Sequence, residues 1–189
     1  MSTLEFLQQR TSIPAKLLTE PAPNRAELRE MIKAAVAAPD HAALQPWRFI
    51  LIEGEARRKL GDIFADATRA REPDMDEEKI ERQREKPLRA PMIITVVCKI
   101  TENHPKTPEI EQLLSAGAAA QQLMLAANAL GYDAIWLTGP NSADETVKTA
   151  LGITRKDRIV GFIYLGTSSI AKPNVRRPEP DAFLESWPG

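Results

Sequence analysis

The run of residues 92–98, Met-Ile-Ile-Thr-Val-Val-Cys, constrains the fold more than any other stretch of the chain. Its β-branched residues favour an extended strand, and a strand without alternating polar residues is typically buried on both faces. Pro87 and Pro91 flank the short linker before it. We therefore expect this run to be a central strand of a sheet.

Apolar runs and helical patterns alternate along the rest of the chain. Short strands are expected at residues 48–53, 132–138 and 159–165. The spacing of apolar residues predicts helices over 3–10, 25–38, 55–71 and 108–130, and a further helix from Ser142, as its N-cap, to Leu151. Asn24 and Glu27 have the spacing of a capping box at the start of the second helix. Together these elements predict an α+β or α/β class, with long helices outweighing four or five short strands.

Length and charge narrow the classes of protein that the chain can be. A chain of 189 residues suits one domain with an ordinary core. Its 25 basic and 26 acidic residues give no reason to expect binding to nucleic acid or to an anionic membrane. The densely charged residues 72–89 are expected to form a solvated helix or a partly mobile lid.

The single cysteine, Cys98, excludes an intrachain disulfide and any multi-cysteine metal site, and it fits a reducing cytoplasm. We expect this thiol to be a buried apolar group on the central strand. The N-terminus shows no signal-peptide pattern. Residues 113–130 are rich in alanine but interrupted by polar side chains, so they indicate a buried helix or a subunit interface and not a membrane span.

Motifs of several enzyme classes are missing from the sequence. The glycine-rich turn of a Rossmann domain, the P-loop and the nucleophile elbow of serine hydrolases do not occur. A metal site would have to use His41, Asp40 and scattered acids, without the short-spaced ligand pairs that metals favour. We therefore expect no metal.

Three segments carry the remaining functional candidates. Arg10-Thr11-Ser12 follows the first helix, residues 39–47 (Pro-Asp-His-Ala-Ala-Leu-Gln-Pro-Trp) form a polar loop, and residues 135–140 (Ile-Trp-Leu-Thr-Gly-Pro) end a strand. The guanidinium of Arg10 and the hydroxyl of Ser12 can donate to a phosphate. The structural alternatives are a surface arginine at a helix end, a hydrogen-bonded loop histidine at position 41, and core tryptophans at positions 47 and 136.

In this order and spacing, the three segments resemble the nitroreductase family of flavoproteins over nearly the whole chain. The resemblance is closest to the small, minimal members, which also carry Ala-Pro-Asp-His in the loop, Glu-Pro-Ala-Pro upstream and the pattern of residues 161–167. It implies a nitroreductase-like α+β fold with a central, mostly antiparallel sheet of four to five strands surrounded by helices. Residues 1–189 would form one domain that works as a homodimer, with residues 168–189 as a C-terminal extension over the partner subunit.

The resemblance also implies a site for FMN. Contacts to FMN are expected from Arg10, Thr11, Ser12, Ala37, His41, Trp136, Leu137, Thr138 and Gly139, and further basic contacts from Lys16, Arg176 and Arg177. The nicotinamide donor is expected at Ala126, Ala127, Asn128, Ala129, Leu130 and Gly131. The chain departs from the commoner family pattern in three places. Pro14 replaces a basic residue, which makes Lys16 a candidate for the charge near the pyrimidine edge; Thr11 replaces a frequent arginine; and Ala43 replaces an asparagine, which leaves more of the recognition to His41.

The implied activity is that of an FMN-dependent NAD(P)H oxidoreductase that reduces nitroaromatic, quinone or similar acceptors by ping-pong hydride transfer. The flavin carries the chemistry, so no side chain is expected to act as an obligatory acid. Two alternatives remain open from the sequence. One is another flavin chemistry, such as dehydrogenation or flavin fragmentation, on the same scaffold. The other is a non-enzymatic helical interaction module.

Overall fold

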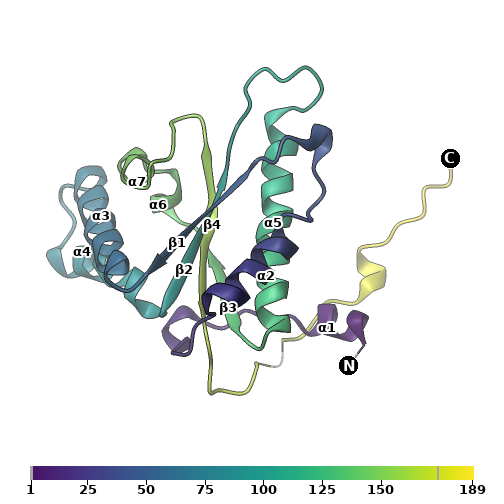
Figure 1. Cartoon of the computed structure of the whole chain (residues 1–189), viewed down its shortest axis with the longest axis horizontal. Coiled ribbons are helices and arrows are strands. Elements are labelled where there is room, and N and C mark those ends of the chain that lie inside the picture. Colours follow the sequence, from purple (N-terminus) through teal and green to yellow (C-terminus); the bar gives the residue numbers. More distant parts are fainter. Residues whose placement is uncertain (1, 174) are drawn as a thin grey trace.

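A computed structural model describes residues 2–173 and 175–189, and Figure 1 shows its sheet between two groups of helices. The strands are β1 (Trp47–Glu53), β2 (Met92–Cys98), β3 (Asp133–Leu137) and β4 (Arg158–Gly166). The α-helices are α1 (Thr3–Gln9), α2 (Arg25–Ala35), α3 (Glu55–Arg71), α4 (Glu77–Arg84), α5 (Glu109–Ala129), α6 (Pro140–Ala143) and α7 (Glu145–Ala150). Short 3-10 turns are η1 (Ala15–Leu17), η2 (His41–Ala43), η3 (Lys86–Arg89) and η4 (Pro180–Ala182).

The sheet is four-stranded and antiparallel, with the order β1-β2-β4-β3. Every residue of β2 is buried, and its neighbours pair with it in registers such as Phe49 with Val96 and Ile94 with Ile163. The expected central strand and the expected antiparallel sheet are therefore confirmed.

Alternating residues of the strands send side chains to two separate cores. On one face Leu60 and Phe64 of α3 pack against Phe162 and Tyr164 of β4. On the other face α2 and α5 cover Ile94, Ile163 and Leu165. Figure 1 shows α3 and α4 on one side of the sheet and α2 and α5 on the other. The sheet thus separates the molecule into two sides, which matters for the site described below.

The start of α2 follows the capping rules, but the end of α2 and the N-cap of α7 do not lie where the sequence predicted them. Asn24 Oδ1 accepts the backbone N–H groups of Ala26 (2.9 Å) and Glu27 (3.1 Å), which confirms the predicted capping box. The helix α2 ends at Ala35 and not at residue 38, because residues 36–38 tighten into a turn. Asp144, and not Ser142, caps α7, since its Oδ1 accepts from the N–H of Thr146 at 2.9 Å.

The charged segment at residues 72–89 folds mainly as α4 and η3. The carbonyl of Arg84 lies so near Gly61 of α3 that a Cβ on Gly61 would be 2.2 Å from this oxygen, so the glycine permits the close approach of the two helices. Arg84 also forms an ion pair with Asp62. Whether this segment moves as a lid stays a prediction.

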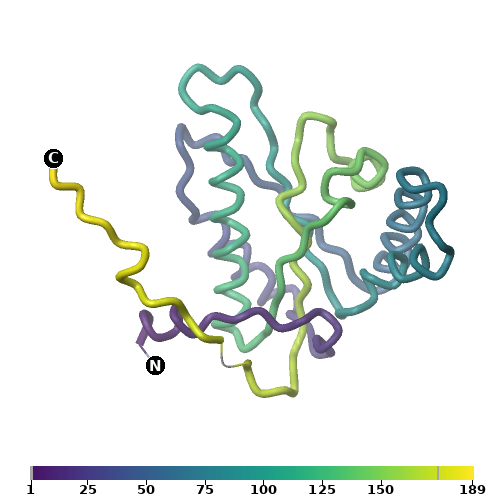
Figure 2. Tube along the Cα trace, turned by 180° about the vertical axis from the view of Figure 1, so that it is seen from behind, coloured from purple at the N-terminus to yellow at the C-terminus, as the bar shows by residue number. Residues whose placement is uncertain are grey.

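The two ends of the folded region are joined beside the sheet. Thr19 and Thr167 exchange backbone hydrogen bonds of 2.8 Å, and the Thr167 hydroxyl donates to the carbonyl of Pro21 at 2.7 Å. Further upstream, the N–H of Ile13 donates to the Ala134 carbonyl of β3 at 3.2 Å. Figure 2 shows the N-terminal segment and the C-terminal tail on the same side of the molecule. In the part of the chain that the structure describes, no helix is both long and apolar enough to cross a membrane.

Candidate functional site

A pocket of about 300 Å³ opens where β3 leaves the sheet. Its wall includes the aromatic pair Phe64 and Phe162, whose ring centroids lie 5.3 Å apart in an edge-to-face arrangement. Gly139, with φ of 98°, turns the chain at the end of β3 into Pro140, the first residue of α6. The lining residues are Phe64, Lys86, Arg89, Leu137, Thr138, Gly139, Pro140, Asn141, Phe162 and Tyr164. Three predicted FMN contacts, Leu137, Thr138 and Gly139, therefore line one pocket.

Two basic side chains of η3, Lys86 and Arg89, give the pocket a positive rim. Burial lowers the pKa of Lys86, and the nearby charges of Arg89 and Arg71 lower it further. Within the described residues, no carboxylate forms an ion pair with Lys86 or Arg89. A pocket with aromatic walls and two uncompensated cations suits a flat ligand with an electron-rich or anionic edge.

Sequence reasoning missed Lys86 and Arg89 because it treated residues 72–89 as one solvated run. The available signal was their position beside Pro87 and Pro91, immediately before the most buried strand. Lys16, the residue that the sequence suggested for this charge, is an exposed residue of η1 and does not line the pocket.

The loop after Gly139 is fixed by Arg71 at the end of α3. Arg71 Nη2 donates to the Asn141 side-chain oxygen at 2.9 Å, and Nη1 forms an ion pair with Asp144. Burial would raise the pKa of Asp144, but the hydrogen bond from Arg71 and those from the backbone of Val147 and Thr146 outweigh it, so this pKa is lowered. The carboxylate therefore stays charged and holds the loop to α3.

The N-terminal segment at residues 10–12 leads into Ile13, whose backbone N–H donates to Ala134 of the edge strand β3. Arg10 Nη1 donates to Ser12 Oγ at 3.3 Å, and Thr11 is buried between them. Ile13, the next residue, belongs to the buried cluster that contains Phe64 and Tyr164. Arg177 of the tail donates to the backbone carbonyl of Arg10. Of the two tail arginines, Arg177 is therefore the one that contacts a residue predicted to bind the phosphate, while Arg176 is exposed.

The side chain of Trp136 lies on the other face of β3. Its indole Nε1 donates to the carbonyl of Val160 at 3.1 Å, and the ring packs with the α2 and α5 core. Gly161 leaves room for this ring, because a Cβ there would lie 2.0 Å from Nε1. The side chain of Trp136 thus faces away from the pocket that Leu137 lines.

His41 lies in η2, which packs against the first turns of α5 and not against the pocket. Its Nδ1 lies 2.6 Å from Glu111 Oε2, and Ser115 Oγ donates to the Pro39 carbonyl at 2.7 Å. Since α5 covers the α2 side of the sheet and Phe162 faces the α3 side, the sheet stands between His41 and the pocket. One chain therefore does not bring His41 together with Thr138 and Gly139.

The remaining predicted residues lie at the end of α5 and, in the case of Ala37, in the turn after α2. Ala37, Ala126 and Ala129 share a shallow hollow with Phe6 of α1, whereas Ala127 is fully buried. Asn128 Nδ2 donates to the Tyr132 carbonyl at 2.7 Å, and Gly131, with φ of 89°, ends the helix. Leu130 is 41% exposed. Within the described residues, no group of three or more His, Cys, Asp or Glu side chains could hold a metal ion.

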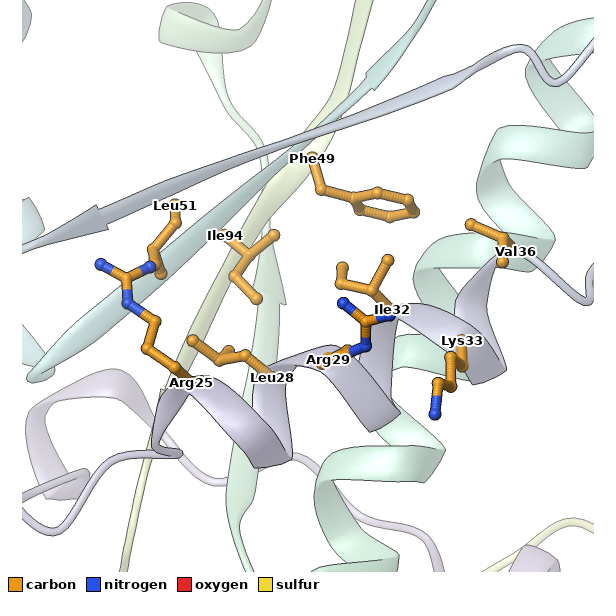
Figure 3. Close-up of a pocket in the computed structure, with 9 residues that line it drawn as sticks. All are labelled: Arg25, Leu28, Arg29, Ile32, Lys33, Val36, Phe49, Leu51 and Ile94. Atoms are coloured by element: carbon orange, nitrogen blue, oxygen red, sulfur yellow. The ribbon is translucent and has the colours of Figure 1, made fainter.

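Two more hollows lie outside the predicted site or at its edge. One of about 630 Å³ is formed by α5 and the β3–β4 edge, with Leu114, Gly117, Trp136 and Val160 in its wall. The other, shown in Figure 3, lies between α2 and β1, where the apolar side chains of Leu28, Ile32, Phe49 and Ile94 lie beside basic residues of α2. None of the predicted site residues lines this second groove.

Comparison with known proteins agrees with this geometry. The model of the Nitroreductase family matches residues 7–167 of the chain. A curated relative from Escherichia coli, named "Putative NAD(P)H nitroreductase YdjA", is 40% identical over 97% of this chain and 98% of its own length.

Two solved structures share the fold. The Nitroreductase-like Family Protein from Bacillus cereus has a TM-score of 0.82 and 25% identity, covering 100% of this chain and 97% of that one. A protein from Desulfovibrio desulfuricans, described as a "putative nitroreductase in complex with FMN", has a TM-score of 0.71 and 27% identity, covering 97% and 95%. The four-stranded antiparallel sheet, the pocket at the end of β3 and these matches lead to one conclusion: the chain belongs to the nitroreductase family.

Proposed function

We propose that this protein is an FMN-dependent NAD(P)H oxidoreductase, with nitroaromatic compounds, quinones or similar molecules as electron acceptors. The observation that carries the proposal is the pocket at the end of β3, where aromatic walls and two uncompensated cations surround Leu137, Thr138 and Gly139. Bound FMN would supply hydride chemistry, taking two electrons from NAD(P)H and passing them to the acceptor.

The residues of the chain fit the chemical groups of FMN. Arg10, Ser12 and Arg177 would hold the phosphate, because a guanidinium and a hydroxyl are strong donors to phosphate oxygens. Lys86 and Arg89 would face the pyrimidine edge of the ring, and their positive charge would favour electron uptake there. The backbone of Leu137, Thr138 and Gly139 would lie along the ring, fixed from behind by the contacts of Arg71.

The second half of the site would come from another copy of the chain. His41 lies across the sheet from the pocket, so a homodimer is the simplest arrangement that puts its loop near a flavin. The exposed apolar residues Ile110 and Leu114 of α5, which are 60% and 65% exposed, offer a surface for such a dimer. With donor and acceptor using one position in turn, the kinetics would be ping-pong.

The absorption spectrum of the purified protein tests the proposal. We expect flavin bands that bleach anaerobically with NADH or NADPH and return when a quinone or nitroaromatic acceptor is added. A yellow protein that neither nucleotide bleaches would indicate other flavin chemistry. A colourless protein that does not bind added FMN would refute the proposal and favour an interaction module.

Arg10→Ala tests the phosphate contact. Removing a charged donor costs about 1.5–3 kcal/mol, so the Kd for FMN should rise about 10- to 100-fold. His41→Ala should change the Kd much less and mainly alter the rate of reduction. Arg82→Ala is a suitable control, since this exposed arginine pairs with Glu78 on α4. Equal FMN retention by Arg10→Ala and wild type would mean that the phosphate is bound elsewhere.

A further inference from the structure

The loop between α2 and β1 has an unusual backbone. Ala42, Ala43 and Gln45 have φ values of 62°, 51° and 49°, so three residues other than glycine adopt the left-handed region within four positions. Side chains with a Cβ disfavour this region, and such strain persists only where surrounding contacts enforce it. The loop therefore requires contacts that hold it in place.

Those contacts come from the loop itself and from α5. Asp40 accepts hydrogen bonds from the backbone N–H groups of Leu44 at 3.2 Å and Gln45 at 2.7 Å. Ser115 Oγ fixes the Pro39 carbonyl at 2.7 Å. Glu111 contacts only a side chain of the loop, through the 2.6 Å distance between its Oε2 and His41 Nδ1. Asp40 and Ser115 thus hold the backbone of the loop, whereas Glu111 contacts the imidazole of His41.

We propose that Glu111 is a positioning residue for His41, which holds the proton on Nδ1 and presents Nε2 to the cofactor bound by a second copy of the chain. A carboxylate beside Nδ1 accepts its N–H and so selects the tautomer and the ring orientation. Nε2 forms no hydrogen bond with any residue that the structure describes, so it is available to a ligand. This inference rests on the proposed function, because it assumes that His41 serves a flavin.

A contribution to folding does not account for this contact. The side chains of His41 and Glu111 are 55% and 44% exposed, and an ion pair at such exposure contributes little to stability. Fixing the tautomer, by contrast, does not depend on a large stabilising energy. Glu111→Gln should therefore leave the Tm within about 2 °C of wild type and change the state of the imidazole.

Nitrogen NMR of histidine-labelled, flavin-free protein reads the tautomer directly. The chain has 2 histidines, so the spectrum of His41→Gln assigns the remaining signals to His104. At about pH 9, where imidazoles are ordinarily neutral, we expect His41 to be protonated on Nδ1 in wild type and to lose this preference in Glu111→Gln. Glu109→Gln is the matched control, because this exposed acid lies in the same first turn of α5.

Stopped-flow reduction of the FMN-loaded protein by NADH provides the functional readout. Glu111→Gln should lower the rate at saturating NADH about 3- to 10-fold, with an unchanged Kd for FMN, whereas Glu109→Gln should match wild type. An Nε2-protonated His41 in wild type, or a tautomer unaffected by Glu111→Gln, overturns the inference. A shifted tautomer with an unchanged reduction rate also overturns it. Failure of wild type to bind FMN refutes the proposed function itself, and the flavin-free NMR spectrum distinguishes that case.

Discussion

Gly161 on β4 lies next to β3, and replacing it with alanine should strongly lower the stability of the protein. A Cβ at this residue would lie 2.0 Å from Nε1 and 2.4 Å from Cδ1 of Trp136, and 3.1 Å from the Leu137 carbonyl oxygen. The two distances to Trp136 are far inside van der Waals contact, and both atoms belong to a rigid ring. Gly161→Ala therefore requires the indole of Trp136 to move away from its position against β4.

Two costs add in this variant. Overpacking typically costs about 1–3 kcal/mol. The indole also loses its 3.1 Å hydrogen bond to the Val160 carbonyl, which contributes about 0.5–1.5 kcal/mol. The sum is about 1.5–4.5 kcal/mol of unfolding free energy, which lowers the Tm by about 3–18 °C in a chain of this size. Because β3 continues into Thr138 and Gly139, FMN binding should weaken as well.

Thermal unfolding followed by circular dichroism measures this effect, and Gly117→Ala provides the matched control. The nearest atom to a Cβ on Gly117 is Cη2 of the same tryptophan, at 4.0 Å, and the residue lies inside α5. That substitution should stabilise the protein by about 0.5–1 kcal/mol. Adding Trp136→Leu to Gly161→Ala should remove the clash, so the double variant should lose less stability than the two changes sum to. A Gly161→Ala protein that melts within about 1 °C of wild type would refute the reasoning.

Three further outcomes are expected. Gln112→Leu removes hydrogen bonds of 2.8, 2.9 and 3.0 Å that tie Thr101 and Thr107 to α5, and it should cost about 2–4 kcal/mol in urea unfolding; a loss below about 1 kcal/mol would contradict this. Burial raises the pKa of Cys98 to about 11, so a disulfide reagent at about pH 8 should label the folded protein at least ~100-fold more slowly than the unfolded chain; rapid labelling would show that β2 opens easily. The pKa of Lys86 is lowered from its ordinary value of 10.5, so the folded state binds this proton less tightly than the unfolded state. The charge of Lys86 therefore destabilises the protein at neutral pH, and this penalty decreases as the pH rises from the folded pKa towards 10.5. Lys86→Met should accordingly raise the Tm by about 1–3 °C at about pH 7 and by less near about pH 10; an equal gain at both pH values would exclude this cause.

Local patterns located most helices and strands because the residues that define them are neighbours in sequence. The apolar run at residues 92–98 coincides with β2, and the capping box of Asn24 begins α2 where expected. The errors arise where residues distant in sequence determine where a helix begins or ends. Asp144 caps α7 because Arg71, from another helix, holds its carboxylate at that place.

The candidate site was less accessible to sequence reasoning than the fold. The grouping of Arg10 and Ser12 with Leu137 and Gly139 came from a family resemblance, since no local pattern relates segments so far apart. Lys86 and Arg89 differ from the basic residues of α4 because they have no acidic partner among the described residues, and Lys86 is also partly buried. Both are properties of the folded chain. The side of the sheet on which His41 lies is likewise set by packing against α5.

The pair of backbone hydrogen bonds between Thr19 and Thr167 also affects when the protein becomes functional. These residues lie 148 positions apart, and closing so long a loop costs conformational entropy that only late contacts repay. During synthesis Arg10 leaves the ribosome before Ala134, which accepts a hydrogen bond from Ile13, and before Thr167, which pairs with Thr19. The first phosphate-binding candidates to be made are thus among the last to be put in place. A cofactor held by them would be acquired after translation, and a stalled or truncated chain that ends before Thr167 should not retain it.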